Sequence, residues 1–191
     1  MSSPVGILLA AGASARFGAA KLLHPLADGT PVGVAAARAL LQALPDSIAV
    51  VRPGDQALID AFTALGMQVV ENPRAEAGMG ASLAAGVAAT PAAAGWLIAL
   101  ADMPWLQPVT IRTLADRLRH GASMVAPLCQ GRRGHPVGFA ARWQAALCGL
   151  SADQGARDLL AQHPHELELI TSGDAGVLAD VDYPDDLNRC C

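Results

Sequence analysis

The sequence predicts an α/β fold of three layers, in which helices cover both faces of a mostly parallel sheet. Short apolar runs without charge, typical of buried parallel strands, alternate with longer segments that suit helices. The alternation continues along nearly the whole chain, as it does in parallel α/β sheets. The chain has 191 residues, 52% of them hydrophobic, and neither an internal repeat nor a linker interrupts it. Residues 1–191 are therefore expected to form one domain.

The individual elements follow from the apolar runs and from residues that start or end helices. The predicted strands are Val5–Ala11, Ile48–Val51, Met67–Val70, Trp96–Ala101, Met124–Pro127, Pro136–Phe139, Glu166–Ile170 and Leu178–Val181. The predicted helices are Val32–Leu44, a segment from Pro53-Gly54-Asp55 through Leu65, Ala81–Ala89, Pro108–His120, Trp143–Leu147 and Gly155–Gln162. Asp55 is expected to cap its helix, because its carboxylate can accept a hydrogen bond from a backbone N–H of the first turn. Residues 24–31 and Leu128–Gly134 are expected to be turns.

The loop after the first predicted strand has the composition of a polyphosphate site. Small residues from Gly12 to Ser14 let backbone N–H groups approach a ligand, and Arg16 and Lys21 add two positive charges. Open α/β sheets bind ligands at such places, outside the carboxyl ends of their strands. A Gly/Ala-rich turn is equally common as a mere connection. The chain contains neither G-x-x-x-x-G-K-[ST] nor G-x-G-x-x-G, which excludes a Walker loop and a dinucleotide fingerprint.

Acidic residues follow two other predicted strands. Asp102 comes directly after Trp96–Ala101 and is expected to bind Mg²⁺, which prefers one or two carboxylates together with substrate phosphates. Capping of the next helix is the alternative role for Asp102. Asp180 and Asp182 lie two residues apart near the last predicted strand, so they would share a face and could bind the same ion. A solvated acidic tail is an equally good interpretation of that pair.

Composition excludes several classes of protein. The formal charge of −4 argues against nucleic-acid binding through a broadly basic surface, so an anionic substrate needs a local cluster of cations. The four cysteines lack the C-x-x-C spacing of a metal site and are expected to be reduced, as in the cytoplasm. The apolar runs are too short for a signal peptide or a transmembrane helix. We therefore expect a cytoplasmic protein that binds neither nucleic acid nor membranes.

Several segments resemble one family of enzymes. Residues 9–21 (LAAGASARFGAAK) match the MobA-like nucleotidyltransferase signature L-A-[AG]-G-x-S-x-R-[FM]-G-x-x-K. LADMPWL (100–106) resembles the family's L-x-D-x-P-x-[LV], and ADVDYPDDL (179–187) resembles its D-[IV]-D-x-P-x-D-L ending. GMGASLAAGV (78–87) resembles the segment that contacts the base and ribose. GRRGHPVGF (131–139) and SADQGARDLL (151–160) are similar to segments typical of the molybdenum cofactor cytidylyltransferase branch.

The resemblance implies a Rossmann-like fold of the nucleotide-diphospho-sugar transferase (GT-A-like) type and a set of site residues. Those implied in catalysis are Arg16, Lys21 and Asp102. Those implied in nucleotide binding are Leu9, Ala10, Ala11, Gly12, Ser14, Arg16, Lys21, Asn72, Gly80, Ser82 and Asp102. Those implied in metal binding are Asp102 and Asp182, and those implied in acceptor binding are Arg132, Gly134, His135 and Asp153. For His135, packing beneath Pro136 is an equally good interpretation. The chain departs from the family pattern at Ser151-Ala152-Asp153, where the family has G-D, and at Tyr183, where it has Thr.

The implied activity is that of a CTP:molybdopterin cytidylyltransferase, with Mg²⁺ as cofactor. A phosphate oxygen of the acceptor would attack the α-phosphorus of CTP, and pyrophosphate would leave. Ala11 favours CTP, because guanylyl-transferring relatives carry L-A-G-G and the methyl group would narrow the base pocket against a purine. A molybdenum hydroxylase apoenzyme is a candidate partner. Two alternatives remain open: nucleotidyl transfer to a sugar phosphate or another alcohol phosphate, and a molybdenum cofactor carrier or insertion chaperone without turnover.

Overall fold

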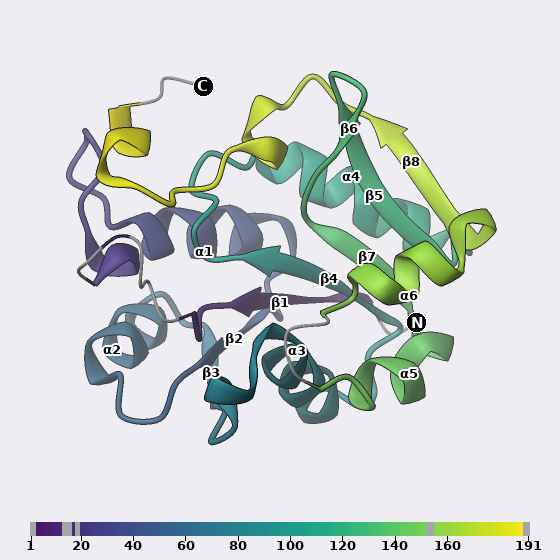
Figure 1. Ribbon diagram of the computed structural model, residues 1–191, viewed down its shortest axis with the longest axis horizontal. Helices are drawn as coiled ribbons and strands as arrows, with labels where there is room; N and C mark the ends of the chain where they lie inside the picture. Colours follow the sequence, from purple (N-terminus) through teal and green to yellow (C-terminus); the bar gives the residue numbers. More distant parts are fainter. Residues whose placement is uncertain (1–2, 13–16, 18–19, 152–154, 189–191) are drawn as a thin grey trace.

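The structure is a computed structural model that describes residues 3–12, 17, 20–151 and 155–188, and it is built on one twisted sheet (Figure 1). Eight strands pair in the order β3-β2-β1-β4-β7-β5-β6, and β8 pairs with β5. The strands are β1 (Val5–Leu9), β2 (Ile48–Val51), β3 (Gln68–Glu71), β4 (Gly95–Leu100), β5 (Met124–Cys129), β6 (Arg132–Arg133), β7 (Val137–Ala140) and β8 (Leu167–Thr171). The α-helices are α1 (Val32–Ala43), α2 (Gln56–Ala64), α3 (Met79–Ala89), α4 (Pro108–Arg119), α5 (Gln144–Cys148) and α6 (Arg157–Gln162).

Strand direction decides which loops meet. β1 pairs in parallel with β2 and β4, and β2 pairs in parallel with β3, so the carboxyl ends of these four strands share one edge. β7 lies between β4 and β5 and is antiparallel to both. The residues that precede β7 therefore reach the same edge as the residues that follow β4.

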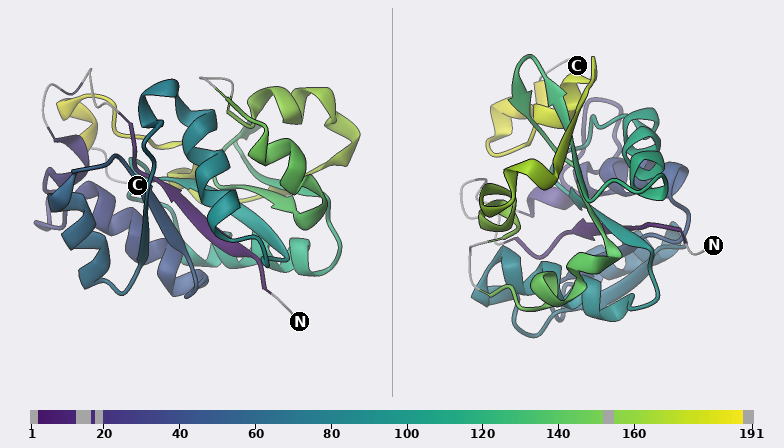
Figure 2. Two further views of the ribbon diagram at one scale, coloured as in Figure 1. Left: turned by 90° about the horizontal axis from the view of Figure 1, so that it is seen from below. Right: turned by 90° about the vertical axis from the view of Figure 1, so that its right-hand side faces the viewer.

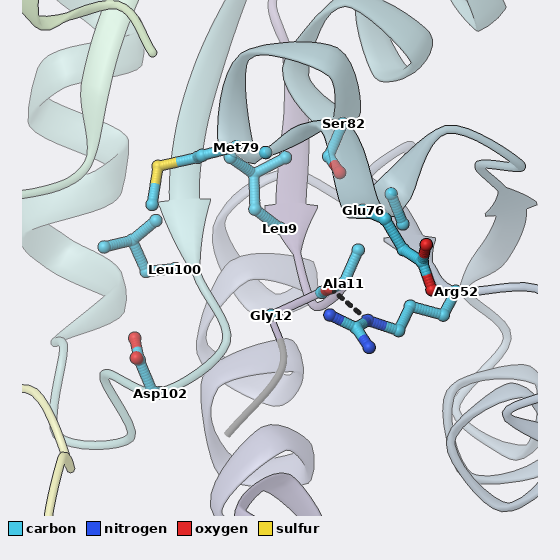
Figure 3. A pocket seen from close by; sticks show the side chains of 11 residues that line it. Leu9, Ala11, Gly12, Arg52, Glu76, Met79, Ser82, Leu100 and Asp102 are labelled. Carbon is cyan, nitrogen blue, oxygen red and sulfur yellow. Dashed lines mark hydrogen bonds between the residues drawn. The ribbon is translucent and has the colours of Figure 1, made fainter. Parts of the chain in front are cut away.

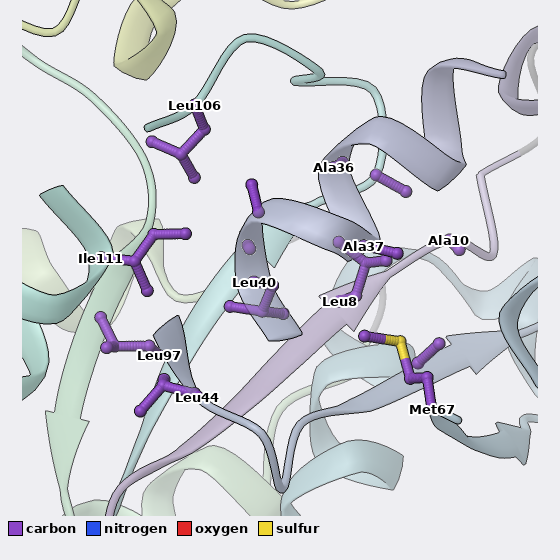
Figure 4. Packing of buried hydrophobic residues seen from close by; sticks show 14 of the residues in the cluster. Leu8, Ala10, Ala36, Ala37, Leu40, Leu44, Met67, Leu97, Leu106 and Ile111 are labelled. Atoms are coloured by element: carbon purple, nitrogen blue, oxygen red, sulfur yellow. The ribbon is translucent and has the colours of Figure 1, made fainter. Parts of the chain in front are cut away.

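Apolar side chains alternate between two cores, one on each face of the sheet. Leu8 of β1 packs with Leu40 of α1 and Ile111 of α4 on one face (Figure 4). Its neighbour Ile7 packs on the other face with Leu83 of α3, because successive residues of a strand point to opposite sides. Figures 1 and 2 show the resulting layers, with α1 and α4 on one face and α3 and α5 on the other. Among the described helices, none combines the length and apolarity needed to cross a bilayer.

The fold class predicted from the sequence is confirmed, and most element boundaries shift by only one or two residues. Asp55 caps α2 as expected, since its side chain accepts a hydrogen bond from Leu58 N. The α3 helix begins two residues earlier than predicted, directly after Gly78, whose φ of +109° is a conformation that favours glycine. The predicted turn at 128–134 is a hairpin in which β5 extends to Cys129 and pairs with β6.

The predicted last strand, Leu178–Val181, is wrong. Residues Ala175–Leu178 form a 3-10 helix, and the buried Asp174 carboxylate stabilises its start by accepting a hydrogen bond from Gly176 N. Gly176 lies against the backbone of Trp105, where a Cβ atom would be only 2.2 Å from the Trp105 carbonyl oxygen. The segment after this helix is tied to the sheet edge through Val181 N, which donates to Asp102 O at 2.9 Å. The short apolar pattern of Leu178–Val181 therefore belongs to a connecting segment and not to a strand.

Candidate active site

The carboxyl edge of the parallel strands holds a cavity of about 340 Å³ (Figure 3). Arg52 directly follows β2, Asn72 directly follows β3, and Asp102 comes two residues after β4. The cavity is lined by Leu9, Ala11, Gly12, Arg52, Ala75, Glu76, Gly78, Met79, Ser82, Leu100 and Asp102. Leu9, Ala11, Gly12, Ser82 and Asp102 were all predicted to bind the nucleotide. The structure thus brings residues more than 90 positions apart into one cavity because their strands are parallel neighbours.

A lysine and two aspartates meet at one end of this edge. Lys21 lies in a 3-10 helix (Lys21–Leu23) and is only 8% exposed, so its charge needs partners. Its Nζ donates to Asp102 Oδ2 at 2.8 Å and lies 3.6 Å from Asp182 Oδ1. The predicted pairing of Asp180 with Asp182 assumed a strand that does not form, and Asp180 is exposed. Asp182 is the acidic residue of that segment that approaches Lys21.

The same carboxylates suit a divalent cation. Asp102 Oδ1 is buried, and within the described part of the chain it has no hydrogen-bond partner. A buried carboxylate oxygen without a partner is costly, so this atom calls for a cation or a donor. Among the described residues, no three or more His, Cys, Asp or Glu side chains form a metal-binding group. Hard divalent cations can be held by one or two carboxylates together with substrate phosphates, and Asp102 and Asp182 are chemically suited to this role.

Asn72 and Ser82 form a buried polar contact beside the cavity. Asn72 is 2% exposed; its Nδ2 donates to Ser82 Oγ at 3.2 Å, and its Oδ1 accepts from Arg74 N at 3.0 Å. These bonds join the loop after β3 to the first turn of α3. Ser82 lines the cavity, whereas Asn72, which was also predicted to bind the nucleotide, does not line it and instead hydrogen-bonds to Ser82. Gly80 is buried in the same helical turn. Ala10 is buried after β1, where its N–H donates to Val50 O at 2.9 Å.

A second, larger cavity of about 560 Å³ adjoins the first. Both are lined by Leu9, Met79 and Leu100, so these three residues form a shared wall. The polar side chains that line the second cavity come from the segments before β7 and around α6: Arg133, His135, Arg157 and Asp158. The two cavities therefore lie side by side along this edge of the sheet, and Asp102, the partner of Lys21, lines the first one.

Burial controls the protonation of His135. Removal from water lowers the pKa of the His135 imidazole below its ordinary value, because the charged form loses hydration. The Ile98 carbonyl and the Asp102 and Asp180 carboxylates oppose this change but are weaker. His135 Nδ1 is buried without a hydrogen-bond partner in the described ranges. The ring is therefore neutral near pH 7, and one of its nitrogens has hydrogen-bonding capacity left for a ligand.

Comparison with known proteins identifies the family. A model of the MobA-like NTP transferase domain matches residues 6–167. The chain belongs to the MobA-like NTP transferase family. It is 33% identical to nicotine blue oxidoreductase of Paenarthrobacter nicotinovorans over 193 residues, covering 96% of this chain and 94% of that protein. It is 29% identical to the purine catabolism protein PucB of Bacillus subtilis over 201 residues, covering 97% of this chain and 96% of that protein.

Solved structures agree with this assignment. Rv0371c of Mycobacterium tuberculosis superposes with a TM-score of 0.82 and 29% identity over 98% of this chain and 97% of that one. Its complex with manganese gives a TM-score of 0.80 and 27% identity over the same shares of the two chains. A nucleotidyl transferase of Methanothermobacter thermautotroptrophicus shares the fold at 24% identity, with a TM-score of 0.82 over 96% of this chain and 94% of that one. The protein is thus a nucleotidyltransferase of the MobA-like class.

Other predicted site residues of this MobA-like domain have varied positions. Gly134 is buried, and a Cβ there would lie 2.3 Å from Val177 O, so it serves close packing. Arg132 is exposed on β6, and the neighbouring Arg133 is the one that lines the second cavity. Ser14, Arg16 and Asp153 lie outside the described residues.

Sequence reasoning missed three arginines of the MobA-like domain that line its cavities: Arg52, Arg133 and Arg157. The sequence does indicate Arg52, because it directly follows a buried strand, much as Asp102 follows another buried strand by two residues. Arg133 and Arg157 stood inside the motifs quoted for the acceptor, but only the three-dimensional arrangement shows which side chains line a cavity.

Proposed function

We propose that the protein transfers a cytidylyl group from CTP to a phosphate of a molybdopterin-type acceptor in a Mg²⁺-dependent reaction. The observation that carries the proposal is the buried Lys21, shared by Asp102 and Asp182 beside two adjoining cavities. One cavity would hold CTP and the other the acceptor. The manganese complex of the Mycobacterium tuberculosis relative supports a divalent cation, and the L-A-A-G segment with Ala11 supports CTP.

The reaction needs positioning and charge neutralisation and no covalent intermediate. An acceptor phosphate oxygen forms a bond to the α-phosphorus of CTP, the bond from that phosphorus to the bridging oxygen breaks, and pyrophosphate leaves. Lys21 would neutralise phosphate charge as it builds up on the leaving group. Bound Mg²⁺, held by Asp102 and Asp182, would supply electrostatic stabilisation of the phosphates.

Two arginines and one aspartate line the second cavity and leave a net positive charge, which suits a phosphate-bearing acceptor. Arg133 and Arg157 would bind its anionic group, since a guanidinium matches phosphate geometry. The neutral His135 ring would hydrogen-bond to the acceptor without adding charge. Apolar residues such as Leu83 and Leu160 line the same cavity and suit a flat ring system.

We further propose that the product is passed on to a molybdenum hydroxylase apoenzyme in the cytoplasm. Residues 1–191 are proposed to act as one domain in this reaction.

Pyrophosphate release tests the proposal. Purified protein with Mg²⁺ is given CTP, GTP or UTP, each with molybdopterin, with a sugar phosphate or with no acceptor. Pyrophosphate release from CTP only with molybdopterin supports the proposed reaction. Release with a sugar phosphate would instead support the alternative reaction, nucleotidyl transfer to a sugar phosphate. Tight binding of molybdopterin without any release supports the carrier role. Because one relative is named an oxidoreductase, the same mixtures are monitored for oxidation of an added reductant, and such oxidation without pyrophosphate release would overturn the proposed cytidylyl transfer.

A further inference from the structure

Arg52 is held in place at the wall of the first cavity. Its Nε donates to Ala11 O at 2.7 Å, so the side chain reaches across from the end of β2 to the end of β1. This bond fixes the guanidinium plane and uses one of its five N–H donors. Figure 3 shows the group extending to the Ala11–Gly12 segment, with Glu76 and Ser82 on its side of the cavity and Asp102 on the opposite side.

We infer that Arg52 is the residue that selects the base of the nucleotide, by donating hydrogen bonds from its terminal nitrogens to the acceptor edge of cytosine. Cytosine presents two adjacent acceptors, N3 and O2, which match the parallel donors of a guanidinium. Uracil carries a hydrogen on N3, so it would place a donor against a donor. The inference rests on the proposed use of CTP and names the side chain that would read its base.

Charge decides between the base and the phosphates as the partner of Arg52. The triphosphate needs cations, and the proposed function places these at the opposite end of the edge: Lys21, together with the divalent cation that Asp102 and Asp182 would hold. Arg52 instead shares its side of the cavity with the carboxylate of Glu76, which disfavours a polyanion there. A neutral base with hydrogen-bond acceptors is the part of CTP that suits this end.

The contact with Ala11 joins Arg52 to the segment that differs between guanylyl- and cytidylyl-transferring relatives. Ala11 is buried, and its carbonyl accepts the Arg52 bond. The Ala11 methyl group limits the size of the base, while Arg52 would read its hydrogen-bonding edge. A pocket that pairs polar groups with its ligand rejects an analogue with the wrong pattern more strongly than shape alone does.

Binding of CMP and UMP without metal tests the inference, measured by calorimetry on the full chain. Wild-type protein should prefer CMP, and Arg52→Gln should reduce that preference about 10- to 100-fold, the range for loss of a bidentate base contact. CTP and CMP should weaken by the same factor, because the lost contact is to the base. Arg52→Lys, which keeps the charge but not the two parallel donors, should also lose the preference. Arg38→Gln removes an exposed arginine of α1 and is the matched control with unchanged preference.

Each other result has a distinct meaning. A CMP preference that survives in both Arg52→Gln and Arg52→Lys would show that Arg52 only clamps Ala11, and would overturn the inference. Weaker binding of CTP with unchanged binding of CMP would make Arg52 a phosphate ligand and overturn it as well. A wild-type protein without any CMP preference would overturn the proposed use of CTP together with this inference. Thermal unfolding of each variant verifies that the fold is intact.

Discussion

Replacing Lys21 with Met removes the ammonium group that joins two carboxylates at the sheet edge. Lys21 is 8% exposed, and its closest partner, Asp102, has a side chain that is 25% exposed. Breaking a fully buried ion pair costs about 3–5 kcal/mol, because one charge is left without a partner. Asp102 is partly hydrated, so we expect a smaller loss of unfolding free energy, roughly 2–3 kcal/mol. For a chain of this length that corresponds to a decrease of roughly 4–12 °C in Tm.

The partner mutation separates the structural role of Lys21 from its role in the reaction. Asp102→Asn in the Lys21→Met background removes the uncompensated charge, so the double variant should recover most of the lost stability. Its turnover should stay low, because it lacks both the Lys21 ammonium, a donor expected to contribute about 10²–10³ in rate, and a carboxylate proposed to hold the cation. The Lys21→Met single variant measures the contribution of Lys21 to turnover. Lys21→Arg keeps the charge and serves as the matched control for stability.

Urea and thermal unfolding measure the stabilities, and pyrophosphate release measures turnover. The cycle isolates the coupling between the two residues, which should exceed about 1 kcal/mol. Strictly additive effects, or a Lys21→Met protein with wild-type stability, would show that the 2.8 Å contact contributes nothing to folding. Near wild-type turnover of Lys21→Met would remove Lys21 from the mechanism.

Three further predictions concern neighbouring residues. Ala11→Gly should widen the base pocket and raise the use of GTP relative to CTP about tenfold, measured as kcat/KM; unchanged values for both nucleotides would contradict the pocket argument. Gly134→Ala should cost about 1–3 kcal/mol in urea unfolding, since its Cβ would lie 2.3 Å from the Val177 carbonyl oxygen, whereas Gly173→Ala has open space and is the control. Burial lowers the pKa of His135, so the unfolded state binds more protons and stability falls as pH decreases below about 6.5. His135→Gln should flatten this fall between pH 7 and 5, and an unchanged slope would assign it to other groups.

The parallel half of the fold was predictable because its strands are nearly pure apolar runs. β1, β2 and β4 are buried on both faces, so they contain no charged or polar side chain and consist of Val, Ile, Leu, Ala and Trp with one Gly each in β1 and β4. Their carboxyl ends then had to meet at one edge, and this placed Gly12 and Asp102 together from sequence alone. The same rule applied to β2 predicts that Arg52 also lies at this edge, because Arg52 directly follows that strand.

The acidic carboxyl-terminal segment was not predictable in the same way. Four residues with an apolar pattern are compatible with a strand, but long-range contacts decide the outcome. Asp174 accepts hydrogen bonds from Gly176 N and also from Gln107 N and Thr110 Oγ1, and the last two partners lie more than 60 residues earlier in the chain. The secondary-structure propensities of this segment carry no information about these long-range contacts. The position of Asp182 near Lys21 could therefore only be expected from the family resemblance.

The antiparallel strand β7 explains why the two cavities adjoin. Ile98 of β4 is paired with Val137 of β7, so the segment that enters β7 at His135 and the residues that follow Ile98 lie at the same edge of the sheet. His135 and Leu100 line the second cavity, and Leu100 also lines the first. A parallel β7 would begin at the opposite edge of the sheet, far from Asp102. A slip of one residue would turn Val137, which lines the second cavity, to the other face, because side chains alternate along a strand. The position of the second cavity next to the first is therefore a consequence of strand direction and register, neither of which is local in the sequence.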